Sequence, residues 1–248
     1  MKNKFLVMLM GSLVLFWTGS VFAVSFNPFV GSTGGSPIGF AYAGNKFVGS
    51  NYFNNQLYQT GLAGGNLQPF GASLPISSGS IGEIYVSSSL GLGGFGSSAA
   101  RDVFAGPEAA GNVYRFSNDG STQSLFASGL NGDVRGIAFD PYGDYGFNML
   151  VTTQTGNVYT VDSAGSSTLL ANVGADAEGL DFTPQAFGNI PAHTLVVVSE
   201  GTGQLTAITP AGEKTDLGLH FGTPEMLSFV PLNLGDSGNP LEGFYAAK

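Results

Sequence analysis

Three charged residues stand at corresponding positions of a repeated sequence unit, and their types could bind a ligand. Arg135, Glu178 and Glu225 each lie two residues before an apolar residue that begins a copy of the unit. Asp133 and Asp176 lie two residues before the first two of them. We expect Arg135, Glu178 and Glu225 to form a ligand-binding site if the fold brings the copies together. Converging carboxylates suit a hard cation such as calcium, so Glu178, Glu225, Asp133 and Asp176 form a candidate metal-binding set.

An ion-paired, hydrated opening would also explain these residues. Arg135 could balance Glu178 without any bound metal, because charged side chains that leave bulk water are usually paired. The sequence leaves both alternatives open, and it assigns no catalytic residue.

An internal repeat defines these positions. Residues 110–129 (AGNVYRFSNDGSTQSLFASG) and residues 155–174 (TGNVYTVDSAGSSTLLANVG) align at a spacing of 45 residues. Looser copies extend the repeat to both sides. Their apolar first-strand anchors are spaced by 44, 53, 43 and 47 residues and are Phe40, Ile84, Ile137, Leu180 and Leu227.

Each copy contains four short apolar or alternating runs separated by turn residues, a pattern typical of β-strands. A period near 45 residues with four strands per copy predicts an all-β chain that folds as a β-propeller, in which each four-stranded sheet is one blade. Residues 24–248 contain about four complete blades and a partial fifth. The first strand of each blade lines the central channel, so the charged positions are expected at one channel mouth.

Several segments resemble the six-bladed propellers of the NHL, YWTD and gluconolactonase-like (SMP-30) groups. They are GIAFDPYG, EGLDFTP and GNVYTVDSAG, and GQLTAITPAGEKTDL is similar to the repeats of streptogramin lyases. The resemblance covers roughly residues 38–247 and implies six blades. Gluconolactonase-like propellers hold a metal at the channel, so the resemblance also implies calcium at Glu178 and Glu225. Because the fifth copy stops in its second strand, we expect a truncated member or an open arc.

The N-terminal segment MKNKFLVMLMGSLVLFWTGSVFA is typical of a secretory signal peptide. It has two lysines, an apolar run and a small residue at Ala23, so we expect cleavage after residue 23; an uncleaved membrane anchor is the alternative. The remaining chain has 6 Lys and Arg against 17 Asp and Glu and contains no cysteine. Six scattered basic residues cannot neutralise a phosphate backbone, which excludes nucleic acid as a partner. No second apolar segment is long enough to span a membrane.

Other motifs carry little chemistry. The GLGGFG segment at residues 91–96 matches a dinucleotide motif but is followed by SSAARDVFAGP, which returns to strand, so a loop insertion explains it better. DPYGDYG and SNDGS do not follow the calcium-loop pattern and predict ordinary turns. Nothing in the spacing of His193 and His220 brings them together.

These observations favour a secreted or periplasmic, bacterial-type propeller that binds a protein or small-molecule ligand and is not an enzyme. The alternative is a calcium-dependent lactonase or hydrolase of the gluconolactonase-like type with its site at the channel mouth. A structural envelope protein is a third possibility, because charged residues are only 10% of the chain.

Overall fold

The computed structural model describes residues 29–65, 67–76, 82–230 and 243–247, and every regular element among them is a β-strand. Four four-stranded antiparallel sheets follow one another along the chain, and each forms one blade. A two-stranded sheet follows them. The predicted all-β propeller of four blades and a partial fifth is therefore confirmed. The strands are β1 (Pro37–Tyr42), β2 (Lys46–Asn51), β3 (Leu57–Gly61) and β4 (Gln68–Phe70) in blade one; β5 (Ile84–Ser88), β6 (Val103–Pro107), β7 (Gly111–Phe116) and β8 (Gln123–Leu130) in blade two; β9 (Val134–Phe139), β10 (Met149–Thr153), β11 (Asn157–Val161) and β12 (Ser167–Asn172) in blade three; β13 (Ala177–Phe182), β14 (Leu195–Ser199), β15 (Gln204–Ile208) and β16 (Lys214–His220) in blade four; and β17 (Met226–Val230) and β18 (Gly243–Ala247) in the last sheet.

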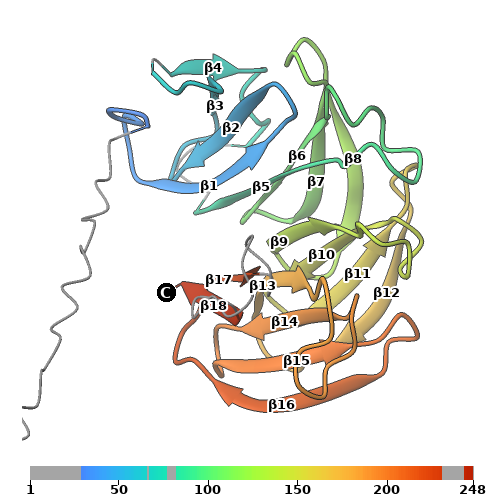
Figure 1. Cartoon of the computed structure of the whole chain (residues 1–248). Coiled ribbons are helices and arrows are strands. Elements are labelled where there is room, and N and C mark those ends of the chain that lie inside the picture. The colour runs from blue at the N-terminus through green and yellow to red at the C-terminus, as the bar shows by residue number, and fades with distance from the viewer. Residues whose placement is uncertain (1–28, 66, 77–81, 231–242, 248) are drawn as a thin grey trace, which may run out of the picture.

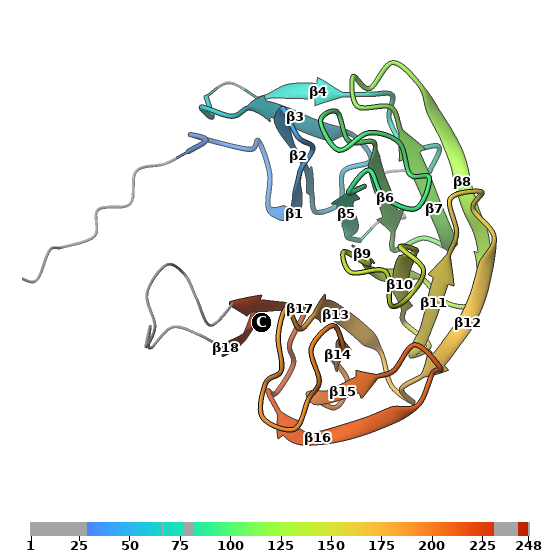
Figure 2. The same ribbon diagram turned by 45° about the vertical axis from the view of Figure 1, so that its right-hand side comes forward.

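The blades stand side by side as an open arc (Figures 1 and 2). The first strand of each sheet faces the centre of the arc, and β4, β8, β12 and β16 lie on its outer rim (Figure 2). The opening of the arc lies between β1 and the β17–β18 sheet (Figure 2). Among the described residues, no helix has the length and hydrophobicity needed to cross a membrane.

Alternate residues of each strand pack against opposite neighbouring blades, because side chains of a strand point in turn to its two faces. Phe104, Val113 and Ala127 of blade two meet Met149 and Val151 of blade three in one buried cluster. The same arrangement recurs between blades one and two and between blades three and four. Each blade therefore buries both faces only when it has a neighbour on each side.

Glycines in the inner strands allow neighbouring blades to approach closely at the centre. A Cβ on Gly136 of β9 would lie 2.6 Å from the carbonyl oxygen of Glu178 on β13. A Cβ on Gly179 would overlap the backbone of β17 at Met226 and Leu227. These contacts bring the residues beside the glycines, Arg135 and Glu178, to the same part of the arc.

The strand pairing corrects the sequence alignment of the second copy. Val86 pairs with Ala105 and then Tyr114, just as Ile137 pairs with Val151 and then Tyr159. The anchor of copy two is therefore Val86, and the expected anchor Ile84 was wrong by two residues. A slip of two residues keeps the alternating pattern, because Ile84 and Val86 point to the same face of β5. The two strands also differ before their anchors: the ladder of β9 shifts between Val134 and Gly136, so Arg135 is an extra residue, whereas β5 pairs without a bulge.

Candidate functional site at the channel mouth

A cavity of about 200 Å³ lies at the centre of the arc and is lined by residues of all five inner-strand segments. Its walls are mainly apolar and include Phe40, Val86, Ile137, Leu180 and Leu227. Glu83, Tyr85, Arg135 and Glu225 also line it. The cavity therefore combines an apolar interior with charged groups from blade two, blade three and the last sheet.

Arg135 is the centre of the charged group. Its Nε lies 3.3 Å from Oδ1 of Asp176 and 3.5 Å from Oε1 of Glu178. Its terminal nitrogen also pairs with Glu108, which begins the loop after β6. The structure thus brings three of the predicted residues, Arg135, Asp176 and Glu178, into direct contact.

The other two predicted residues lie at the edge of this group. Asp133 precedes β9, and its Oδ1 accepts a hydrogen bond of 2.8 Å from the backbone N–H of Ala110. Glu225 precedes β17 and is exposed. Partial burial and then the nearby charges of Glu83 and Glu200 raise the pKa of Glu225.

Tyr85 joins two carboxyl groups that come from different blades. Its hydroxyl oxygen lies 2.6 Å from Oε2 of Glu83 and 2.8 Å from Oε2 of Glu178. A phenol has a single proton and can donate it fully to one partner only. Burial raises the pKa of Glu178 to about 8, beyond the opposing effects of Tyr85 and Arg135. A pKa of about 8 favours the protonated form of Glu178 at pH 7, and a protonated carboxyl group can donate to Tyr85 while Tyr85 donates to Glu83.

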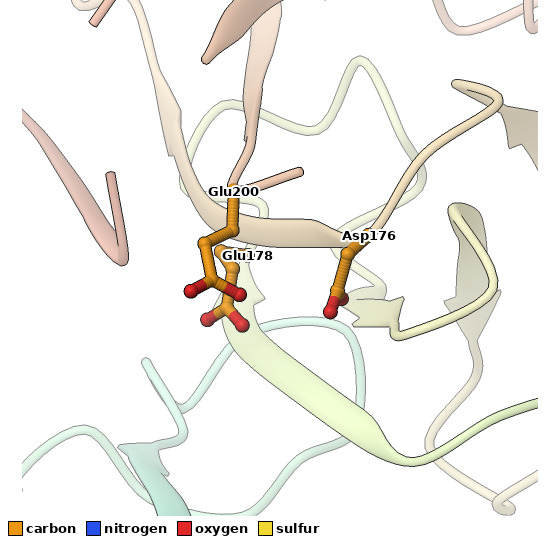
Figure 3. A group of neighbouring side chains, drawn as sticks. All are labelled: Asp176, Glu178 and Glu200. Carbon is orange, nitrogen blue, oxygen red and sulfur yellow. The ribbon is translucent and has the colours of Figure 1, made fainter. Parts of the chain in front are cut away.

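Three carboxyl groups form a possible cation site next to Arg135. One oxygen of each of Asp176, Glu178 and Glu200 lies within 4.8 Å of the other two. Figure 3 shows the three side chains pointing in the same direction, from β13 and from the residues that directly precede β13 and follow β14. The donor set of carboxylate oxygens fits a hard cation such as calcium. The pKa of Asp176 is raised, chiefly by burial, and the nearby charge of Arg135 opposes this rise.

Four residues of the site were missed by the sequence analysis, namely Glu83, Tyr85, Glu108 and Glu200. Their positions in the repeat are a signal that could have found most of them, as three equivalent backbone hydrogen bonds show. The N–H of Glu108 donates to the carbonyl of Glu83, that of Gln154 to Asp133, and that of Glu200 to Asp176. Each bond joins the residue after a second strand to the residue before a first strand. In antiparallel strands these two ends lie at the same channel mouth. A comparison of the repeats therefore has to align the residues after the second strands as well as the residues before the first strands.

The two histidines lie elsewhere and have different neighbours. His193 stacks on Tyr142, with ring centres 3.9 Å apart, and its Nδ1 lies 2.9 Å from Oδ2 of Asp144. His220 ends the outer strand β16, and its Nδ1 lies 3.3 Å from the carbonyl oxygen of Thr202. Residues 91–96 form part of the loop between β5 and β6, in agreement with the predicted insertion.

Comparison with known proteins identifies the fold. No protein-family model matches the sequence, and no curated protein matches it. Solved structures do match: a catalytically inactive virginiamycin B lyase from Staphylococcus aureus with quinupristin (TM-score 0.60, 12% identity, 79% of this chain and 61% of that chain); the nidogen/laminin complex (0.55, 13%, 73% and 63%); and YCF48 bound to D1 peptide (0.54, 16%, 79% and 60%).

These likenesses show a β-propeller fold. The proteins with this fold include a lyase and proteins seen in complex with a protein or a peptide. The chain spans only about 60% of the length of these three structures.

Proposed function

We propose that this chain is a secreted or periplasmic propeller without catalytic activity that binds a ligand carrying a cationic group at the channel mouth. The observation that carries the proposal is the central cavity with its surplus of carboxyl groups. Glu83 and Glu225 line the cavity together with Arg135, and the charge of Arg135 is already balanced by Glu108 and Asp176. Even with Glu178 neutral, the mouth attracts cations.

The shape of the cavity indicates what kind of cation fits. Apolar side chains from the inner strands form most of its wall, so a ligand gains free energy by burying an apolar body as well as by pairing its charge. A lysine or arginine side chain of a partner protein, or a small organic amine, has both features. The complexes of the matched propellers with a protein and with a peptide support such a role for the fold.

Hexylammonium and hexanoate are suitable probes for this site, because they share an apolar chain and differ in the sign of their charge. We expect isothermal titration calorimetry to show binding of hexylammonium and none of hexanoate, because the carboxylates repel an anion. Glu225→Gln is expected to weaken hexylammonium binding about tenfold, or ~1.4 kcal/mol. Glu213→Gln, at an exposed turn between β15 and β16, is the matched control and should leave binding unchanged. Equal binding of hexanoate and hexylammonium, or no binding of either, contradicts the proposal.

A calcium site is the second candidate function, and the grouping of Asp176, Glu178 and Glu200 favours it. In the lactonase alternative, the bound metal would polarise a substrate carbonyl as a Lewis acid. This chain's own residues would bind the metal through Asp176, Glu178 and Glu200, so Glu178 would have to lose its proton. Arg135 would orient Asp176 and Glu178.

The calcium hypothesis predicts a change in thermal stability. At a calcium concentration 100 times the dissociation constant, binding stabilises the folded chain by ~2.7 kcal/mol, and Glu200→Gln should remove this gain while Glu213→Gln retains it. Thermal unfolding followed with and without calcium measures the effect. An unchanged melting temperature in millimolar calcium excludes the metal site and, with it, the metal-dependent hydrolase.

Two further parts of the proposal concern the N-terminal segment and the family. We propose that residues 1–23 are a signal peptide, and mass spectrometry of the exported protein should then give a chain beginning at Val24. We also propose a relation to the six-bladed NHL, YWTD and gluconolactonase-like groups, based on the repeat segments and on the propeller fold.

A further inference from the structure

The carboxyl groups at the channel mouth differ in how many of their oxygens are still free for a ligand. Glu108 uses both of its oxygens, because Oε1 pairs with Arg135 and Oε2 accepts a 3.0 Å hydrogen bond from the N–H of Glu83. Glu178 also uses both: Oε1 lies 3.5 Å from Nε of Arg135, and Oε2 lies 2.8 Å from the hydroxyl oxygen of Tyr85. Neither group therefore presents a free pair of oxygens to a ligand.

Glu83 is a half-buried carboxylate that lines the central cavity, and one of its oxygens is also engaged. Its Oε2 lies 2.6 Å from the hydroxyl oxygen of Tyr85, a short distance that is typical of a hydrogen bond to a charged group. Oε2 therefore faces the hydroxyl that also contacts the buried Glu178. Among the described residues no hydrogen bond or ion pair reaches Oε1, so this is the oxygen that Glu83 can direct to a ligand.

Glu225 supplies a second carboxylate from a different part of the arc. It precedes β17, whereas Glu83 precedes β5, and both side chains line the same cavity. Glu225 is exposed, and an exposed ion pair contributes little affinity by itself because water competes for the charge. A cation is therefore held best where it contacts Glu83 and Glu225 together, with oxygens that come from two separate carboxylates.

The chain already places a guanidinium group of its own at this mouth. Arg135 lines the cavity and forms ion pairs with Glu108, Asp176 and Glu178. A guanidinium binds most strongly to a carboxylate that offers both oxygens to its planar fork of N–H groups. The carboxyl groups around Arg135 are thus occupied by an internal guanidinium, and the cavity leaves single oxygens for a ligand.

We propose that the channel mouth selects a primary ammonium group over a guanidinium and that Tyr85 determines this choice. The inference rests on the proposed function of the cavity as a site for a cationic ligand. An ammonium carries its N–H donors on a single nitrogen and points them in different directions, so it can contact one oxygen of Glu83 and one of Glu225 at once. The ligand is then a lysine side chain of a partner protein or a small primary amine.

Isothermal titration calorimetry with hexylammonium and hexylguanidinium tests the selection, because these probes share their apolar chain and their charge. We expect hexylammonium to bind about tenfold more tightly, since a hydrogen bond to a charged group that stays unmade costs about that much affinity. Tyr85→Phe releases Oε2 of Glu83 and should reduce the preference to less than about threefold by improving guanidinium binding. Tyr114→Phe, in the core between blades one and two, is the matched control and should retain the preference. Circular dichroism melting verifies that both variants remain folded.

A derivative of lysine distinguishes the two sources of the ammonium group. If Nα-acetyl-lysine methylamide binds as tightly as hexylammonium, the ligand is a lysine side chain of a partner protein. If it binds much more weakly while hexylammonium retains its preference over hexylguanidinium, the ligand is a small amine. Both results support the selection of a primary ammonium group.

Three outcomes would overturn the inference, and they separate it from the proposed function. Equal binding of hexylguanidinium and hexylammonium contradicts the selection but leaves the cation site intact. A preference that Tyr85→Phe and Tyr114→Phe both leave unchanged shows that Tyr85 does not determine it. If neither cation binds, the proposed function fails and the selection fails with it.

Discussion

Replacing Glu178 with Gln is expected to stabilise the protein at pH 9 and to reduce the pH dependence of its unfolding between about pH 4.5 and 8. The side chain of Glu178 is 2% exposed, and its pKa rises from 4.5 to about 8, chiefly because burial disfavours the charged form. The proton that it holds also satisfies Tyr85, which lies between Glu178 and Glu83. Ionisation of Glu178 would place a buried negative charge beside Tyr85 and close to Glu83.

The sign of the effect follows from proton linkage. Between about pH 4.5 and 8 the folded chain keeps a proton on Glu178 that the unfolded chain has lost, so stability falls as pH rises. The contribution of the neutral carboxyl is fully present below pH 4.5 and is lost once the pH passes about 8. Because a tenfold change in proton affinity corresponds to ~1.4 kcal/mol, the shift from 4.5 to about 8 corresponds to a loss of about 5 kcal/mol in the unmodified protein.

Urea unfolding at a series of pH values, in the presence of a chelator, measures this prediction. Gln has the shape of the neutral carboxyl and can donate to Tyr85 at every pH, so Glu178→Gln should lose the part of the pH dependence that Glu178 contributes. Asp176 and Glu225, whose pKa values are also raised, keep contributing to the remaining slope. Glu213→Gln should retain the slope of the unmodified protein, because Glu213 is exposed. If Glu178→Gln and the unmodified protein show the same slope, Glu178 is charged in the folded state and the hydrogen-bond assignment at Tyr85 is wrong.

The sequence predicted the fold well because a propeller repeats one pattern. The shared Asn-Val-Tyr segments predicted the third strands correctly, and Asn157–Val161 is the third strand of its blade. The same periodicity placed Arg135 and Glu178 side by side before any coordinates were known. A register derived from five repeats is robust because each strand must alternate between two buried faces.

The rest of the site could not be predicted because single-residue details interrupt the repeat. Counting two residues back from the wrong anchor Ile84 leads to Gly82, and counting two back from Val86 leads to Ile84, because β5 lacks the bulge that inserts Arg135 in β9. Both counts miss Glu83. Glu108 and Glu200 belong to the ends of second strands, which the alignment of first strands does not examine. Tyr85 resembles any strand tyrosine, and its contact with Glu178 joins residues 93 positions apart in the sequence.

Asp140 illustrates a residue whose role only the packing reveals, and its replacement by Ala is expected to have the largest effect on stability. DPYGDYG predicts a turn, and the structure shows that the carboxylate of Asp140 holds the whole turn together. It is 1% exposed and accepts hydrogen bonds of 2.8 to 3.0 Å from the backbone N–H groups of Tyr142, Gly143, Tyr145 and Phe147. Ala would leave four donors without their acceptor.

The turn that Asp140 organises also connects blades three and four. Tyr145 is buried in the core between these blades, where its hydroxyl accepts a 2.9 Å hydrogen bond from Leu195 N–H and donates to the carbonyl of Ile208. We expect Asp140→Ala to lower the free energy of unfolding by about 3–5 kcal/mol, since buried donors that lose their partner each cost roughly 1–3 kcal/mol before relaxation. Asp140→Asn keeps one acceptor oxygen and should lose about half as much.

Asp162 provides the matched control for this prediction. Its Oδ1 accepts hydrogen bonds of 2.9 Å from the N–H groups of Ala164 and Ser166, but the residue is exposed. Water can replace the carboxylate there, so Asp162→Ala should cost about 1 kcal/mol or less. Equal losses in the two alanine variants would show that Asp140 is an ordinary turn residue. A much larger loss at Asp140 would show that the contact between blades three and four depends on this carboxylate. These two blades carry Arg135 and Glu178, so the geometry of the channel mouth would depend on Asp140 as well, although Asp140 lies outside the mouth.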